Sequence, residues 1–397
     1  MSDRHWDASL PLGRAAARVW SVFAPFGRRI GISHRADHEG GRVMLIKDLK
    51  ALGATRDAWE ALEPAAHGPI EHFEWSRSCV EGLPGLDRLQ MFTVWDGGHC
   101  RAIAPLAVRA SSGFRLESIG VKELFEPMSF MYASRAALAR LCDELARQRR
   151  PIDLQRVTAD APVEDELRRA FRGRGWVRVR PADPYPSLAI DSSWSAPETH
   201  FNSGRRSDFR RALRRAERLG PTHFEVVTPA PSDLHALLGQ AYEIEMQGWK
   251  GRNGTALAVD PSRSDFYSRY FAACCDKGIL RIAFMRIGGK AIGMQLAVET
   301  KQRLWLIKIG HNEAYARSSP GTLLMLEVAR YAAQRGLKSI EFLGRDEPWT
   351  RLWTERLCNC IQIRIYPYAL ASLVPFGLDL WRWTATRMLR IWKREQR

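Results

Sequence analysis

Two stretches of this 397-residue chain, about 190 residues apart, repeat the same succession of strand, turn and strand. The sequence RAIAPLAV at 101–108 matches KAIGMQLAV at 290–298 with one gap, and each is followed by a strand that ends in Ile-Gly. A helix and a further strand then follow in both places. A repeat of this length corresponds to a whole domain and not to a solenoid unit. We therefore interpret the chain as two copies of one α+β unit, with a chance likeness between two amphipathic hairpins as the alternative.

The spacing of apolar residues predicts alternating helices and strands in each copy. We expect an irregular segment at 1–40, a first domain at 41–192, a second domain at 193–370 and a separate helix at 371–397. The first domain is predicted to contain helices at 56–62, 134–148 and 163–172, and strands at 43–46, 89–95, 102–109, 114–119, 152–157, 176–180 and 187–190. The second is predicted to contain helices at 198–219, 232–247, 262–276 and 320–335, and strands at 224–228, 280–287, 291–299, 304–310, 339–343 and 361–366.

The chain is strongly basic, with 60 Lys and Arg residues against 44 Asp and Glu residues and a formal net charge of +16. Such a balance favours anionic partners: nucleic acid, a membrane surface or a phosphorylated molecule. Seven arginines fall between residues 205 and 218, on one predicted helix. No RNA-binding sequence motif accompanies them, so we do not expect nucleic acid as a partner.

The tail at 371–397 combines apolar residues, Trp381 and Trp392 among them, on one helical face with basic residues on the other. This pattern is typical of a helix that lies on an anionic bilayer, and we expect residues 375–397 to contact such a surface. Packing of the apolar face onto the second domain is the alternative. No apolar run reaches the ~18 residues of a spanning helix. We expect a cytoplasmic protein, at most peripheral at the inner face of the membrane.

The seven cysteines include one adjacent pair, Cys274 and Cys275, and no C-x-x-C spacing. An odd count without paired spacings argues against a disulfide framework and against a structural zinc site. We therefore expect no metal and a reducing compartment.

The stretch around residue 320 has the features of an anion-binding helix start. A predicted strand ends at Gly310, and after a polar loop a helix begins at Ser319-Pro320-Gly321-Thr322. Proline suits the first helical position, and the unpaired N–H groups of that turn attract anions. Arg317 precedes this turn and adds positive charge; a plain capped turn is the alternative. The equivalent loop of the first copy, 121–132, has no glycine and carries Glu123 and Glu126, so we expect only the second copy to bind phosphate.

Four segments in this order carry a resemblance to a known family: FNSGRRSDFRRALRRAERLG, EIEMQGWKGRNGTAL, IKIGHNEAYARSSPGTLLMLEVAR and IEFLGRDEPWTRLWT. Together they resemble the GNAT-type acyltransferases of exopolysaccharide and cellulose biosynthesis clusters (CelD-like proteins), a family related in fold to the Fem-type aminoacyl transferases. The resemblance covers residues 185–370. It implies tandem GNAT-like domains of mixed, mainly antiparallel sheet flanked by helices. It also implies acetyl-CoA or another acyl-CoA as co-substrate, with Arg317, Ser319, Pro320, Gly321 and Thr322 at its pyrophosphate, although Pro320 replaces a glycine of the family's phosphate loop.

Amine acylation needs a base that takes a proton from the amine. The candidates are Glu245, beside Trp249 and Lys250, and the pair Asp346 and Glu347, which follows a predicted strand. For each of them a solvated charge or a helix cap is the alternative. Substrate-binding candidates are Trp249, Lys250, Lys308, Trp349 and Trp353: Lys308 interrupts an apolar strand, and the tryptophans of GRDEPWTRLW offer a wall for a sugar or an acyl chain.

From these observations we expect an acyl-CoA-dependent N-acyltransferase, in the simplest case an acetyltransferase. The resemblance suggests an amine acceptor in envelope or exopolysaccharide biosynthesis. Two alternatives stay open: a Fem-like transferase that uses aminoacyl-tRNA, which the arginine-rich helix would suit, and a non-catalytic scaffold of a polysaccharide synthase.

Overall fold

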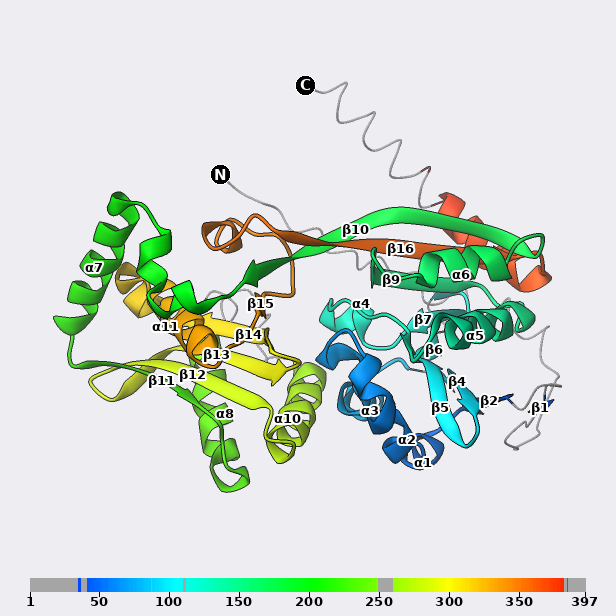
Figure 1. The fold of residues 1–397 in the computed structure, drawn as a ribbon, viewed down its shortest axis with the longest axis horizontal. Coiled ribbons are helices and arrows are strands. Elements are labelled where there is room, and N and C mark those ends of the chain that lie inside the picture. The colour runs from blue at the N-terminus through cyan, green and yellow to red at the C-terminus, as the bar shows by residue number, and fades with distance from the viewer. Residues whose placement is uncertain are drawn as a thin grey trace, which may run out of the picture. The chain divides into compact units, whose positions relative to one another are not determined.

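The computed structural model describes residues 35–36, 41–86, 88–109, 112–248, 260–381 and 384 (Figure 1). The helices of the first half are α1 (Leu49–Gly53), α2 (Arg56–Leu62), α3 (Phe73–Gly82), α4 (Val121–Leu124), α5 (Arg135–Arg147) and α6 (Val163–Ala170). Its strands are β1 (Arg35–Ala36), β2 (Gly41–Ile46), β3 (Arg88–Leu89), β4 (Met91–Asp96), β5 (His99–Ala104), β6 (Leu106–Arg109), β7 (Arg115–Ser118), β8 (Met131–Tyr132) and β9 (Ile152–Thr158).

The second half has the helices α7 (Ser203–Glu217), α8 (Pro231–Met246), α10 (Pro261–Asp276) and α11 (Pro320–Gln334). Its strands are β11 (Thr222–Val227), β12 (Leu280–Ile287), β13 (Lys290–Thr300), β14 (Arg303–His311) and β15 (Ser339–Glu341). Two further strands, β10 (Gly175–Ala189) and β16 (Leu357–Pro367), connect the halves. No helix among the described residues is long and apolar enough to cross a membrane.

The predicted helix at 198–219 begins five residues later in the structure, because Asn202 is extended and caps α7. Its side chain accepts a hydrogen bond from the Arg205 N–H at 2.9 Å, the interaction that typically starts a helix. A separate short 3₁₀ turn occupies Pro197–His200. Helix α3 was not predicted from the sequence. It has a mixed face on which Trp75 and Glu74 are both buried, so the apolar periodicity is weak.

Each half contains one pair of parallel strands that are paired over only two or three residues. In the second half β14 and β15 pair from Arg303↔Ser339 to Trp305↔Glu341. In the first half β7 and β9 pair at Leu116↔Ile152 and Glu117↔Asp153. A helix forms each crossover, as parallel strands require: α11 in the second half and α5 in the first. This common order agrees with the predicted duplication of one α+β unit.

Strands β10 and β16 belong to both halves at once (Figure 1). Their antiparallel ladder runs from Gly175↔Pro367 to Pro186↔Leu357. β10 then pairs with β15 of the second half, and β16 pairs with β9 of the first half. The result is one 11-stranded sheet in the order β11-β12-β13-β14-β15-β10-β16-β9-β7-β6-β3, beside a five-stranded sheet in the order β1-β2-β4-β5-β8.

This exchange, in which each half supplies a strand to the sheet of the other, corrects two predictions. The strands predicted at 176–180 and 187–190 are one continuous strand. Pro184 lies in a bulge between Ala182 and Tyr185, whereas Pro181 and Pro186 lie opposite Ile361 and Leu357 of β16. Prolines are tolerated in a sheet at such irregularities. The strand predicted at 361–366 does not finish the second half alone: its residues pair with β9 between Ile152 and Thr158.

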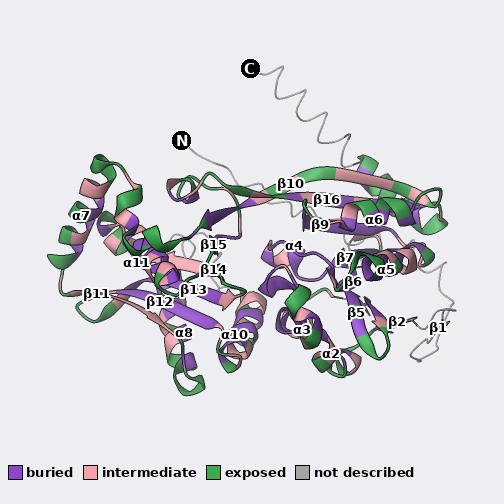
Figure 2. Cartoon of the chain, viewed as in Figure 1, coloured by how far each residue is buried: buried purple, intermediate pink, exposed green. Residues whose placement is uncertain are grey.

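The buried apolar residues form one core in each half and a third cluster that both halves share (Figure 2). In the shared cluster α3 packs against α10. The Trp75 ring contacts Phe266 and Tyr270 edge-on, both at 4.9 Å between ring centroids. Gly82 permits this approach, since a Cβ there would lie 2.8 Å from the Phe266 backbone. Edge-on aromatic pairs of this kind add to the free energy that burial contributes.

Replacing Ile363 of β16 by alanine tests the exchange. The side chain is fully buried in the core of the first half although it follows the second half in sequence. We expect the free energy of unfolding to fall by about 2–5 kcal/mol, because the change leaves a cavity. Denaturant unfolding, followed by circular dichroism and tryptophan fluorescence, measures this. Replacing exposed Asn359 of the same strand by alanine should lower the free energy of unfolding by less than about 0.5 kcal/mol. Equal losses of stability in the two variants would contradict the assignment of β16 to the core of the first half.

Candidate functional site

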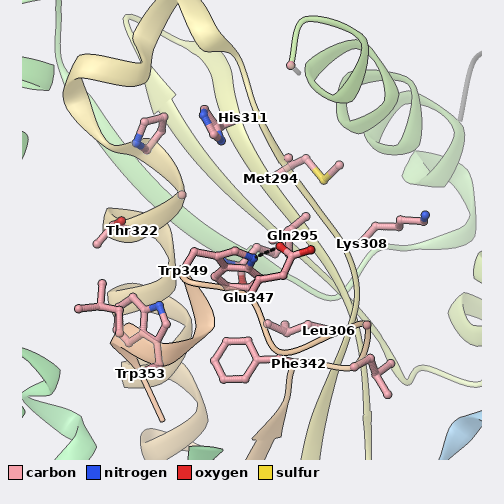
Figure 3. A pocket seen from close by; sticks show the side chains of 18 of the residues that line it. Met294, Gln295, Leu306, Lys308, His311, Thr322, Phe342, Glu347, Trp349 and Trp353 are labelled. Atoms are coloured by element: carbon pink, nitrogen blue, oxygen red, sulfur yellow. Dashed lines mark hydrogen bonds between the residues drawn. The ribbon is translucent and has the colours of Figure 1, made fainter. Parts of the chain in front are cut away.

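A cavity of about 770 Å³ lies beside β14, beyond the point where its pairing with β15 ends (Figure 3). Its walls come from the second half and from one loop of the first. The second half contributes β14 from Leu306 to His311, the start of α11, the end of α8, residues of β13 and α7, and the segment 342–353, and the first half contributes Glu126. The pairing of β14 with β13 continues to His311 on the other side. Beyond Trp305, one edge of β14 therefore has no neighbouring strand and faces the cavity, where a ligand can reach its backbone.

The start of α11 forms one end of the cavity. Ser319 adopts a left-handed conformation, with a φ of 48°, and Pro320 occupies the first turn. The Ser319 carbonyl accepts hydrogen bonds from the N–H groups of Thr322 and Leu323, both at 3.1 Å. Ser319, Pro320, Gly321 and Thr322 all line the cavity, as their predicted role requires. The positive end of the helix dipole therefore points into this end.

Two arginines near this helix start differ from the prediction. Arg317 does not line the cavity; its carbonyl accepts a hydrogen bond from Arg215 Nη1 of α7 at 2.8 Å. Arg205 of the same arginine-rich helix does line the cavity. His311 also lies at this end, and burial lowers the pKa of its imidazole, which keeps the ring neutral near pH 7. Arg205, which the sequence placed only within the arginine-rich helix, thus contributes positive charge to the cavity.

Glu245 reaches the cavity wall from the last turn of α8, with only 1% of its surface exposed. Gly310 of β14 lies against it: a Cβ at this position would lie 3.5 Å from the Glu245 Cα, an ordinary contact, and 3.0 Å from the Met294 side chain. The Gln247 carbonyl accepts from the Glu313 N–H at 3.3 Å and holds the helix end against the loop. A buried carboxylate at this position suits acid–base chemistry.

The other two predicted carboxylates are separated by the structure. Asp346 makes a bidentate ion pair with Arg351, with distances of 2.8–3.2 Å, and does not line the cavity. The hydrogen bonds from Arg351 lower the pKa of Asp346. Glu347 lines the cavity and accepts a hydrogen bond from the Trp349 indole at 2.8 Å (Figure 3). Only Glu347 of this pair is therefore placed to contact a ligand.

The predicted aromatic wall is present. Trp349, at 37% exposure, and buried Trp353 both line the cavity beside Phe342. The ring of Trp349 contacts Phe342 edge-on at 5.5 Å. Lys308 lines the opposite part: in Figure 3 its amine points away from Trp349, and it lies 4.4 Å from the centre of the Tyr267 ring of α10. Trp249 and Lys250 lie outside the described residues.

Sequence reasoning missed two buried polar groups of the cavity. Gln295 of β13 is 4% exposed, and its Oε1 is without a hydrogen-bond partner among the described residues. A buried acceptor of this kind costs free energy unless a ligand or water satisfies it. Glu126 comes from the first half and is 7% exposed; the Gly344 N–H donates to its Oε2 at 3.4 Å. Burial raises the pKa of Glu126 to about 7, against the opposing charges of Arg156 and Lys308.

Residues 203–351 match the family model described as an acetyltransferase (GNAT) domain. This range contains α7, β14, α11 and every cavity residue except Glu126, Leu352 and Trp353. The GNAT domain match is limited to residues 203–351. The predicted enzyme class and the predicted GNAT-like α+β fold are confirmed. Among the described residues, no cluster of three or more His, Cys, Asp or Glu side chains is arranged to hold a metal ion.

Solved structures share this fold at low sequence identity. FemX aligns with a TM-score of 0.54 and 11% identity, over 79% of this chain and 96% of FemX. The C-terminal domain of a protein from Agrobacterium fabrum described as a lysylphosphatidylglycerol synthetase aligns with a TM-score of 0.52 and 11% identity, over 83% and 97%. A tandem GNAT protein of clavulanic acid biosynthesis aligns with a TM-score of 0.43 and 13% identity, over 82% and 99%. No curated protein matches the chain by sequence.

Replacing Glu126 by glutamine should change how stability depends on pH. Below about pH 4.5 the carboxyl is protonated in both states; as the pH rises towards 7, only the unfolded state ionises, which favours unfolding. The wild type should therefore lose at most about 3 kcal/mol between pH 4.5 and 8 through this group. Urea unfolding at pH 5 and pH 8 should show the variant gaining relative to the wild type at pH 8. Glu347→Gln is the exposed control, and a pH-independent difference for Glu126→Gln would contradict the expectation.

Proposed function

We propose that the protein is an acyl-CoA-dependent N-acyltransferase, in the simplest case an acetyltransferase. The supporting observation is the cavity itself: a helix start with an anion-attracting end and a set of buried carboxylates face the same space. The N–H groups and dipole of α11, together with Arg205, would hold the pyrophosphate of the co-substrate at one end. The edge of β14 beyond Trp305 would lie along its pantetheine arm.

The acceptor in this proposal is an amine of envelope or exopolysaccharide chemistry. The resemblance to acyltransferases of exopolysaccharide clusters suggests this class, and the cavity suits it. Trp349 and Trp353 provide flat apolar surfaces of the kind on which sugar rings pack, while Glu347 accepts hydrogen bonds beside them. Glu245, Lys308 and Glu126 lie deeper and supply charge for proton transfer. Asp346, held by Arg351, is dropped from the proposed catalytic set.

A transferase that uses aminoacyl-tRNA is the second candidate, and α7 is the observation that favours it. This helix carries exposed arginines and adds Arg205 to the cavity wall. The fold is shared with FemX and with the lysylphosphatidylglycerol synthetase domain, but such distant likeness concerns the fold alone. Binding of tRNA that weakens steeply with salt, without binding of CoA, would favour this candidate.

Gly321 allows a sharp test of the co-substrate. A Cβ at this position would meet only His311 Nδ1, at 3.8 Å. We therefore expect Gly321→Ala to bind acetyl-CoA within about fivefold of the wild type. Gly321→Glu places a carboxylate beside the pyrophosphate. It should weaken binding at least about 100-fold, since two like charges about 4 Å apart repel by several kcal/mol. Isothermal titration with acetyl-CoA and a longer acyl-CoA measures both; equal affinities for the two variants would overturn the phosphate assignment.

The proposal also places the protein at an anionic membrane surface through its tail. The described part of the tail exposes Leu373 at 65%, Val374 at 53% and Trp381 at 62%. Residues 385–397 add five basic residues against one acid. Exposed apolar side chains beside basic charge are the pattern of an interfacial segment.

Deleting residues 385–397 tests this contact without damaging the core. A cut at 375 would remove Asp379, which accepts a hydrogen bond from Tyr366 and pairs with Arg115 at 2.8 Å. Binding to phosphatidylglycerol vesicles, measured by cosedimentation, should fall at least about tenfold, because each lost basic residue contributes about 1 kcal/mol near the surface. Removing the exposed charges of Arg210 and Arg214 on α7 is the matched control. Unchanged binding after the deletion would show that the tail is not the anchor.

A further inference from the structure

The loop that brings Glu126 into the cavity is the first-half counterpart of the phosphate loop. β7 and β14 both lead to an Ile-Gly pair, and both are the first strand of a parallel pair that ends early. After β14 the chain continues to the left-handed Ser319 and enters α11. After β7 it makes the short helix α4 and turns at Phe125, also left-handed with a φ of 62°. The residue after that turn is Glu126, and it lines the cavity of the other half.

The turn is held by contacts that cross between the halves. Arg156 of β9 donates to the Phe125 carbonyl, to the Gly344 carbonyl at 2.6 Å and to the Asp183 carbonyl at 3.1 Å. The Phe125 ring lies between Arg156 and Arg345, at 4.3 and 4.2 Å from their guanidinium carbons. Arg345 in turn pairs with Asp183 at 3.2 Å. A left-handed phenylalanine is costly unless its surroundings fix it, and here they fix the residue that precedes the carboxylate.

Charged and titratable groups from several elements surround Glu126. Arg156 comes from β9, Lys308 from β14, Tyr267 from α10 and Arg345 from the segment after β15; Glu245 of α8 lies on the same cavity wall. Tyr267 is almost completely buried, and its ring carries Lys308 on one face. Glu126 therefore lies among charged and buried groups on the cavity wall, where a carboxylate can exchange a proton with a bound amine.

We propose that Glu126, a residue outside the acetyltransferase domain, is the general base for the acceptor amine. This rests on the function proposed above. The acceptor ammonium gives one proton to the Glu126 carboxylate and becomes a neutral amine. The amine nitrogen then forms a bond to the thioester carbonyl carbon, the carbon–sulfur bond breaks, and the second proton of the nitrogen passes to the leaving sulfur. The products are an amide and free CoA thiol, and Glu126 returns its proton to solvent.

Glu126 fits this role better than the carboxylates of the second half. Asp346 is paired with Arg351 outside the cavity, and Glu347 is exposed and bonded to Trp349. Glu245 is the competing candidate for the general base. Its backbone lies against Gly310, where a Cβ would be 3.5 Å from the Glu245 Cα. The proposal also explains why the first half retains a loop without a phosphate-binding glycine: its function there is to deliver a carboxylate.

The test compares wild type, Glu126→Gln, Glu126→Asp, Glu245→Gln and Glu123→Gln, with acetyl-CoA as donor and glucosamine as the acceptor probe. Glu123→Gln is the matched control: it alters the same loop, where Glu123 pairs with Arg109 at 2.7 Å, but lies outside the cavity. Acetyl-CoA binding is first measured by calorimetry. If the wild type binds no acetyl-CoA and transfers no acetyl group, the proposed function itself is wrong.

If the wild type binds acetyl-CoA and transfers the acetyl group, Glu126→Gln should lower kcat at least about 100-fold. Its Kd for acetyl-CoA should stay within about twofold of the wild-type value. Activity of the wild type should rise with pH through about 7, following the pKa of Glu126; this rise should vanish in Glu126→Gln and return in Glu126→Asp. Glu123→Gln should keep the pH-dependent rise. The proposal fails if Glu126→Gln keeps kcat or the rise, if Glu245→Gln alone abolishes the rise, or if Glu123→Gln reproduces the loss.

Discussion

The antiparallel ladder between β10 and β16 is the interaction on which both halves depend. Each strand completes the sheet of the other half: β10, from the first half, covers the edge of β15, and β16, from the second half, covers the edge of β9. Unpaired backbone groups at these edges would otherwise be buried without partners, which is costly. Neither copy of the α+β unit is therefore complete alone. The first half cannot be lost without exposing the sheet of the catalytic half, whatever else it contributes.

The sequence predicted the order of elements well but not how they pair. The meander at 280–310, α10 and α11 agree with their predicted positions within one or two residues, because strong apolar periodicity and Gly-Gly turns set them locally. The exchange was not predictable in this way. Alternation along a strand shows which faces are buried, but not which strand lies beside it. Three prolines in 181–186 also indicated a break, whereas the structure places a bulge there.

The same distinction holds for the site. The helix start at 319–322 was predictable, since Pro and Gly at the first turn act through their own backbone. Asp346 was a reasonable candidate by its position after a strand, but its ion pair with Arg351 depends on how the chain turns at Pro348, which the sequence does not show. Glu126 was noted only as a reason for denying phosphate binding to the first half. Its place in the cavity depends on contacts between residues 188 positions apart, Arg156 and Gly344.

The duplicated unit thus offers two loops at the same topological position with opposite electrostatics. One ends in Ser319-Pro320-Gly321 and presents helix N–H groups, which favour an anion; the other ends in Phe125-Glu126 and presents a carboxylate, which favours a cation or a proton. Transfer from an acyl thioester to an amine needs both: a positive end for the donor's phosphates and a negative group for the acceptor's ammonium. A single copy of the unit has only one such loop. Glu126 of the first half lines the cavity of the second, so in the proposed mechanism the two copies together supply both charges.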